Sequence, residues 1–174
     1  MRPALAPPPP THTPLPSQQP VFRTHGCRQG ASEPDVAPCT HVAGSCGPNE
    51  VWSYGADTQA LLSAMILFRA QVLKPYIAAL ARNVSAEGVP TMRPLWFEFP
   101  NDPAAYDVDD QYMLGPEYLV APVTVQGATN RSVVFPGDAG VQWQSVWDAG
   151  VVVAGGATRV VQAPLNVIPV YRRV

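Results

Sequence analysis

The sequence GVPTMRPLWFEFPNDP, residues 88–103, divides this chain into two kinds of pattern. Thr91–Phe99 mixes β-branched, aromatic and polar residues before a Pro-Asn-Asp-Pro turn, which is typical of a strand. Before this stretch, apolar residues recur every three or four positions, and after it short apolar runs alternate with glycine-rich breaks. We therefore predict a strand over 91–99 that joins a helical segment to an all-β segment.

The segment before this strand has the pattern of a helix. From residue 61 to residue 81 its apolar side chains share one helical face. Asp57 or Thr58 can cap the start, and Gly88 supplies the stop. Pro75 has no backbone donor and clashes with the preceding turn. We therefore predict two helical pieces between 57 and 86.

The segment after this strand has the pattern of an antiparallel sandwich, because short apolar runs recur about every ten residues between glycine-rich turns. The predicted strands are 118–125, 131–135, 143–147, 158–162 and 167–172. The predicted core consists of Tyr118, Leu119, Val120, Phe135, Trp143, Trp147, Val160, Val161, Ile168 and Val170. Trp143 and Trp147 could instead stack on sugar rings, but core packing is favoured because large aromatic residues dominate buried cores.

Charge and composition give no reason to expect nucleic acid or a membrane as partner. The chain of 174 residues has 11 basic and 13 acidic residues, spread rather than clustered. Ala60–Leu73 is too short and too polar to span a bilayer, and the proline-rich start does not resemble a signal peptide. The compartment and the oligomeric state remain open.

Two stretches near the start are expected to lack regular structure. Residues 1–20 form a proline-rich tail, and residues 27–50 read as a long loop. Within this loop Cys27, Cys39, His41 and Cys46 could supply four zinc ligands, but their spacing matches none of the usual paired knuckles. We favour a variable loop with incidental thiols, and predict neither a metal nor another cofactor.

A series of seven motifs occurs in a fixed order over residues 20–174. The motifs are PVFRTHG (20–26), WSYG (52–55), LKPYIAALA (73–81), GVPTMRPLWFEFPNDP (88–103), DDQYMLGPEYLVAPV (109–123), WQSVWD (143–148) and APLNVIPVYRR (163–173). This series resembles the C-terminal region of glycoside hydrolase family 31, the α-glucosidases, α-xylosidases and their relatives.

The resemblance implies the fold class: the end of a (β/α)8 TIM barrel followed by an all-β antiparallel sandwich. The barrel part would cover 21–100, with a loop insertion at 27–50, and the sandwich would cover 101–174. Phe22–Gly26 would follow the seventh barrel strand, and 91–99 would be the eighth.

The resemblance also implies one substrate-binding residue. Barrel active sites lie at the C-terminal ends of the strands, where the histidine of the FRTHG motif, His25, would contact the sugar. An imidazole can donate to or accept from sugar hydroxyls. Arg23 in the same motif is expected to support this loop through its several hydrogen-bond donors.

The catalytic residues themselves are expected outside this sequence. Retaining glycoside hydrolysis needs two carboxyl groups about 5 to 5.5 Å apart. The family places both on strands that precede the FRTHG motif. We assign no such pair among Glu98, Asp102, Asp107, Asp109 and Asp110, because Asp102 lies in a proline-flanked turn and Asp109 and Asp110 are neighbours suited to bracing. This chain alone is therefore predicted to be inactive.

Two functions remain in competition. The first is a retaining glycosidase for α-linked glycosides, such as α-glucosides or α-xylosides, of which this chain is the C-terminal part. The alternative is a non-catalytic carbohydrate-binding or interaction module derived from such an enzyme. Hydrolysis only by a polypeptide extended upstream would favour the first, and no hydrolysis by either the short or the extended polypeptide would favour the second.

Overall fold

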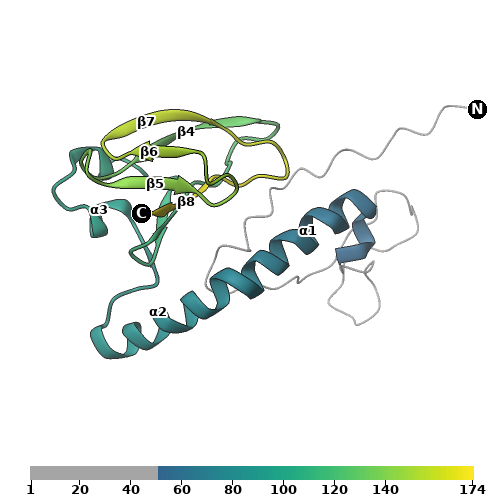
Figure 1. Ribbon diagram of the computed structural model, residues 1–174, viewed down its shortest axis with the longest axis horizontal. Helices are drawn as coiled ribbons and strands as arrows, with labels where there is room; N and C mark the ends of the chain where they lie inside the picture. Colours follow the sequence, from purple (N-terminus) through teal and green to yellow (C-terminus); the bar gives the residue numbers. More distant parts are fainter. Residues whose placement is uncertain (1–50) are drawn as a thin grey trace, which may run out of the picture.

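The computed structural model describes residues 51–174, in which one long helix lies beside a β-domain (Figure 1). The helical elements are η2 (Val51–Tyr54), α1 (Ala56–Phe68), η3 (Arg69–Leu73), α2 (Lys74–Glu87), α3 (Leu95–Glu98) and η4 (Pro103–Ala105). The strands are β1 (Met92–Arg93), β2 (Tyr112–Leu114), β3 (Tyr118–Val120), β4 (Asn130–Phe135), β5 (Gln142–Ser145), β6 (Val152–Ala154), β7 (Ala157–Gln162) and β8 (Val170–Arg173).

The long helix begins one residue earlier than the sequence predicted. Gly55, not Asp57 or Thr58, is its N-cap, and no side chain caps it. The carbonyl of Gly55 accepts from the backbone N–H of Gln59 at 2.9 Å, which closes the first turn. With φ of 90°, Gly55 has a backbone conformation that glycine adopts readily, and this sets the start. The predicted caps were wrong, and Asp57 lies inside the first turn.

The predicted division into two pieces is not present: the helix runs without a break from residue 56 to residue 87, and only its type changes just before Pro75. α1 and α2 are separated by η3, a five-residue π-helical turn whose cap bond runs from the Lys74 N–H to the Arg69 carbonyl. Pro75 occupies the first turn of α2, where a missing N–H costs least. At the other end Gly88 has φ of 71° and closes α2 with a hydrogen bond to Val84, so the predicted stop is confirmed.

Beyond the helix, the predicted strand 91–99 is mostly absent. Only Met92–Arg93 is extended, and it pairs antiparallel with β2. Pro94 has no N–H for a strand ladder and instead becomes the N-cap of α3. The strand pairs of residues 51–174 are all antiparallel, so this part of the chain does not display the predicted end of a parallel barrel.

Two antiparallel sheets make up the β-domain. One has the strand order β1-β2-β3-β8-β5-β6 and the other pairs β4 with β7. Among the predicted strands, β4 and β7 match closely, and the other three are shorter than predicted or displaced. β2 and β6 were not predicted, because each has only three residues.

Two apolar clusters hold these layers together. The first lies between the two sheets and contains Leu119, Phe135, Trp143 and Tyr171. The second joins the larger sheet to the helix through Leu73, Leu80, Leu114 and other side chains. The molecule is thus built as small sheet, large sheet and helix (Figure 1).

Most of the predicted core is confirmed. Tyr118, Leu119, Val120, Phe135, Trp143, Ile168 and Val170 are buried, and Val161 and Trp147 are partly buried. The prediction that Val160 belongs to the core is wrong, because Val160 is 70% exposed on β7. β4 and β7 form a separate two-stranded sheet, so the outer face of β7 has no layer above it within the described region.

The helix docks on the β-domain at Gly115. The Tyr76 hydroxyl donates to the Leu114 carbonyl at 3.0 Å and accepts from the Glu117 N–H at 3.2 Å. Gly115 has φ of 58°, and a Cβ there would collide with the Tyr76 hydroxyl and lie 2.7 Å from Leu80 Cδ2. Gly115 therefore allows both the tight turn and the close approach of α2.

The continuous helical run 56–87 revises one sequence argument. It contains 32 residues and is long and apolar enough, by length and composition, to cross a bilayer; 17% of its most apolar window is buried. The stretch Ala60–Leu73, which was judged too short to span a bilayer, is therefore only part of a longer helix. Core helices and signal sequences meet the same criterion, so the absence of a membrane partner stays a prediction.

Candidate functional site

The segment from β1 to η4 combines buried charge with exposed aromatic rings. Arg93 is buried and forms an ion pair with Glu98, while its Nε donates to the Pro90 carbonyl at 2.6 Å. Burial lowers the pKa of the Arg93 guanidinium from its ordinary value. These bonds tie the end of the strand to α3 and so fix the direction in which the next residues project.

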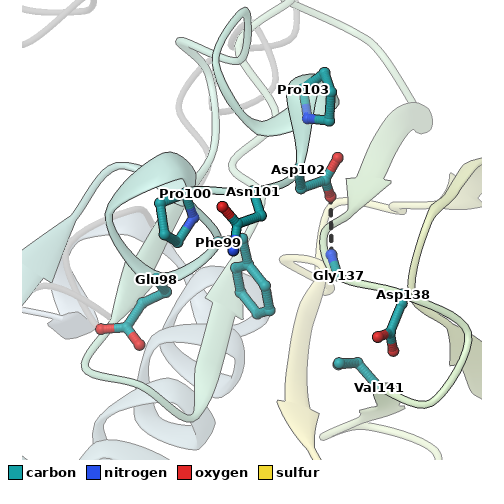
Figure 2. A pocket seen from close by; sticks show the side chains of 9 residues that line it. All are labelled: Glu98, Phe99, Pro100, Asn101, Asp102, Pro103, Gly137, Asp138 and Val141. Carbon is teal, nitrogen blue, oxygen red and sulfur yellow. Dashed lines mark hydrogen bonds between the residues drawn. The ribbon is translucent and has the colours of Figure 1, made fainter.

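A pocket of about 420 Å³ opens beside this segment (Figure 2). Residues from the turn after α3 form one wall, and residues of the β4–β5 turn form the other. Its lining consists of Glu98, Phe99, Pro100, Asn101, Asp102, Pro103, Gly137, Asp138 and Val141. The volume is in the range of small-ligand pockets, and the lining mixes apolar rings with carboxylate and amide groups.

Two of its carboxylates stabilise turns. Asp102 accepts hydrogen bonds from the N–H groups of Ala104 at 3.0 Å and Gly137 at 2.9 Å. Asp138 accepts from the Gly140 N–H at 2.9 Å. Figure 2 shows Glu98 on the opposite side of the pocket from Asp138. The carboxylates therefore serve the local structure, and the geometry gives no reason to choose a catalytic pair.

The acidic residues after the pocket also give no reason to assign a catalytic role. Asp110 forms an ion pair with Arg131 at 2.9 Å, and Arg131 also donates to the Asp110 carbonyl. This pair connects the entry of β2 to β4, as expected of a bracing residue. Asp107 and Asp109 are exposed.

An aromatic group projects from the same segment into solvent. Trp96, Phe97 and Tyr106 are 43%, 40% and 55% exposed. The rings of Trp96 and Tyr106 are stacked with their planes 17° apart and their centroids 6.3 Å apart, and Phe97 lies at the same centroid distance from Trp96. The sequence pattern did not reveal this group, because Thr91–Phe99 was predicted to be a strand, in which alternate side chains would face opposite sides.

The two tryptophans that the sequence put forward are core residues. Trp143 is fully buried, and its indole N–H donates to the Pro136 carbonyl at 3.0 Å. Trp147 is partly buried, packs against Phe68 of α1 and donates to the Ile168 carbonyl. Trp143 therefore has no face free to stack on sugar, and Trp147 is engaged in packing the helix onto the β-domain.

Two tyrosines near the helix have raised pKa values. Burial raises the pKa of Tyr76 and that of Tyr112 to about 12 each. Tyr76 is hydrogen-bonded at the Gly115 turn, whereas the Tyr112 hydroxyl is buried and has no hydrogen-bond partner among residues 51–174. Both therefore favour the neutral phenol.

The predicted substrate contact lies outside the described residues. His25 and Arg23 precede residue 51, as do Cys27, Cys39, His41 and Cys46, so their roles stay predictions. Within residues 51–174, no group of three or more His, Cys, Asp or Glu side chains could hold a metal ion.

The match to a known family begins where the helix ends. Residues 88–174 match the model of the glycosyl hydrolase family 31 C-terminal domain. Alpha-xylosidase from Saccharolobus solfataricus is 34% identical over 136 residues, which are 78% of this chain and 18% of that protein. Alpha-glucosidase 2 from Bacillus thermoamyloliquefaciens is 30% identical over 131 residues, which are 75% of this chain and 16% of that protein.

Solved structures extend the match to the helix. A family 31 alpha-xylosidase from a soil metagenome, complexed with xylose, superposes with a TM-score of 0.77 and 34% identity. The match covers 90% of this chain and 23% of that one. A xylosidase from Aspergillus niger gives a TM-score of 0.75 and 31% identity over 91% of this chain and 22% of its own.

The sheets, the docked helix and the ordered motifs together define the C-terminal β-domain of a glycoside hydrolase, with a helix packed beside it. The chain belongs to glycoside hydrolase family 31. It spans less than a fifth of the length of the two curated relatives described above.

Proposed function

We propose that this chain is the C-terminal part of a retaining glycosidase that acts on α-linked glycosides. The family match over 88–174 carries this proposal, supported by relatives named for α-glucosidase and α-xylosidase activity. An α-glucoside or an α-xyloside is therefore the proposed substrate. The two catalytic aspartates are expected to belong to another part of the enzyme.

In this proposal the 174 residues hold and orient the substrate but do not supply the reacting carboxylates. In the enzyme's reaction one carboxylate would attack the anomeric carbon through an oxocarbenium-like transition state, while the other protonates the glycosidic oxygen as its bond to that carbon breaks. Water, deprotonated by the second carboxyl group, would then release the sugar from the first. His25 would hold a sugar hydroxyl while the carboxylates act, and Arg23 would brace the loop that carries it. These contacts orient the glycosidic bond between the two carboxyl groups.

The helix would pack against the rest of the barrel. The helix carries apolar side chains on its exposed side as well as on its buried side: Met65 is buried, whereas Leu67 is 56% exposed, and Val72 in the next turn is 41% exposed. A helix that is apolar all round is usually covered on more than one side. The β-domain covers one side, and the proposed barrel would cover the others. In that arrangement β1 is the remnant of the eighth barrel strand.

A chimera tests this function directly. In it, the present chain replaces the matching region of the Saccharolobus alpha-xylosidase, and the parent enzyme is the control. We expect the folded chimera to hydrolyse p-nitrophenyl α-xyloside and the 174-residue chain alone to be inactive. A His25→Ala chimera should be at least tenfold slower. Hydrolysis by the 174 residues alone would contradict the proposal, as would a soluble, cooperatively folded chimera without activity.

A carbohydrate-binding module without hydrolytic function is the second candidate. The exposed aromatic rings of Trp96 and Tyr106 favour it, because such rings can bind sugar without any catalytic carboxylate. The chimera separates the two, since a pure binding module would not restore hydrolysis.

A further inference from the structure

The exposed rings of Trp96 and Tyr106 require an explanation beyond folding. Large aromatic side chains dominate cores, and contiguous exposed apolar groups mark sites of interaction. Here the planes of the two rings lie 17° apart, and Trp96 and Tyr106 are 43% and 55% exposed. An exposed pair of nearly parallel rings has a flat outer face, against which the apolar face of a ligand can pack.

These rings are held in place from below. The Tyr106 hydroxyl donates to the Pro100 carbonyl at 2.8 Å, which fixes the far edge of the ring. Leu95 and Ala105, the neighbours of Trp96 and Tyr106 in sequence, are both fully buried and anchor the two ends of the segment. A surface fixed before binding loses little entropy when a ligand is bound.

Polar groups lie next to this surface. Pro100, which accepts from Tyr106, also lines the pocket that contains Asn101 and Glu98. One oxygen of Glu98 pairs with Arg93, so the other can accept a hydrogen bond. An aromatic plane beside amide and carboxylate groups suits a ligand with an apolar face and hydroxyls along its edge, which describes a pyranose ring.

The location agrees with this chemistry. Trp96 lies in α3, just after β1, and Tyr106 packs against it from the end of η4. The proposed function makes β1 the last barrel strand. Active sites of (β/α)8 barrels lie just beyond the C-terminal ends of the strands. A flat aromatic surface there would meet a sugar unit of the substrate.

We propose that Trp96 and Tyr106 form a stacking surface for a pyranose unit of an α-linked oligosaccharide, with Asn101 and Glu98 accepting or donating hydrogen bonds at its edge. The choice of sugar as ligand rests on the proposed function. Contact with a protein surface is the competing explanation, and the test below distinguishes the two.

The test measures sugar binding by the 174-residue chain. Maltotriose and methyl α-xyloside are titrated separately while NMR follows the tryptophan indole N–H signals. We expect at least one sugar to shift the Trp96 signal in a saturable way. Trp96→Ala and Tyr106→Ala should each weaken binding at least tenfold. Trp52→Ala is the matched control, because Trp52 is 65% exposed on η2, and it should leave the affinity unchanged.

Three results would overturn the proposal. The first is that neither sugar shifts the Trp96 signal in a saturable way. The second is that a folded Trp96→Ala variant still binds sugar with the same affinity. The third is that Trp52→Ala weakens binding as much as Trp96→Ala does. If the active chimera buries Trp96 against protein and gains no sugar-dependent protection there, the surface is a protein contact instead. Activity of the chimera is a separate readout, so the stacking surface can fail while the glycosidase function stands.

Discussion

The helix 56–87 and the β-domain that follows it bury their apolar side chains to very different extents. In the β-domain two sheets enclose a cluster with Phe135 and Trp143 fully buried. Along the 32-residue helix, only Met65, Leu73 and Leu80 are classed as buried, although the sequence is strongly apolar. The β-domain thus has a core of its own, whereas the helix shares one with the β-domain and leaves much of its surface uncovered.

This difference indicates that the two regions depend on different partners. A sandwich gains its stability from side chains between its own layers, so it can fold with few outside contacts. An apolar helix docked on one side gains only part of the stability available to it. We therefore expect the β-domain to control global unfolding and the helix to open first.

Trp143→Ala should have the largest effect. Removing this fully buried ring costs about 3 to 5 kcal/mol and also leaves the Pro136 carbonyl without its indole donor. We expect loss of cooperative unfolding of the β-domain in urea, followed by circular dichroism. The control is Val160→Ala on the exposed β7 face, which should change the free energy of unfolding by less than about 0.5 kcal/mol. Equal effects of the two variants would show that the sheets lack the core described above.

Gly115→Ala tests the junction between the regions. The new Cβ would collide with Tyr76 and Leu80, and its φ of 58° is unfavourable for alanine. We expect a cost of about 2 to 3 kcal/mol, since overpacking and strain add. Hydrogen exchange should rise along α2 more than in β5 or β8.

Gly127→Ala is the matched control for that experiment. Gly127 has φ of 75°, but nothing lies within 4 Å of its Cβ position, so it reports the backbone strain alone. It should cost only about 1 kcal/mol and leave exchange in α2 unchanged. If Gly115→Ala behaved in the same way, the close approach of α2 would not be a determinant of docking.

The same comparison explains what the sequence could reveal. Periodicity located α1, α2 and most of the β-domain core, because those patterns depend on neighbours along the chain. It failed at Thr91–Phe99, where the missing N–H of Pro94 ended the strand and began α3. It also failed at Val160, whose exposure depends on which sheets face each other. The stacked rings of Trp96 and Tyr106 were missed for a related reason, since their contact depends on the path of the turns between them.

Tyr76→Phe should have a smaller effect at the same junction. The variant removes the hydroxyl that joins α2 to the Leu114 carbonyl and the Glu117 N–H, at a cost of about 1 kcal/mol. Tyr112→Phe is the control, because the Tyr112 hydroxyl is buried without a partner in the described part of the chain, so its loss should be neutral or stabilising. Urea denaturation of both variants at neutral pH measures the difference. A destabilisation by Tyr112→Phe as large as that by Tyr76→Phe would mean that ring packing, not hydrogen bonding, determines both results.

The last prediction concerns stability at alkaline pH. The free energy of unfolding should change little near neutral pH and should fall increasingly above about pH 10. The folded-state pKa of Tyr112 is raised to about 12, whereas a tyrosine in the unfolded chain titrates near pH 10. The unfolded state therefore loses its proton first. The stability that the neutral phenol of Tyr112 contributes is fully present below about pH 10 and is lost as the pH rises towards 12. Tyr76 adds to the same loss. We expect the urea midpoint to fall between pH 10 and 12, and to fall less steeply in Tyr112→Phe than in the wild type. Identical slopes would show that the phenol of Tyr112 reaches solvent, and the contact between the helix and the large sheet would then be looser than the buried hydroxyl indicates.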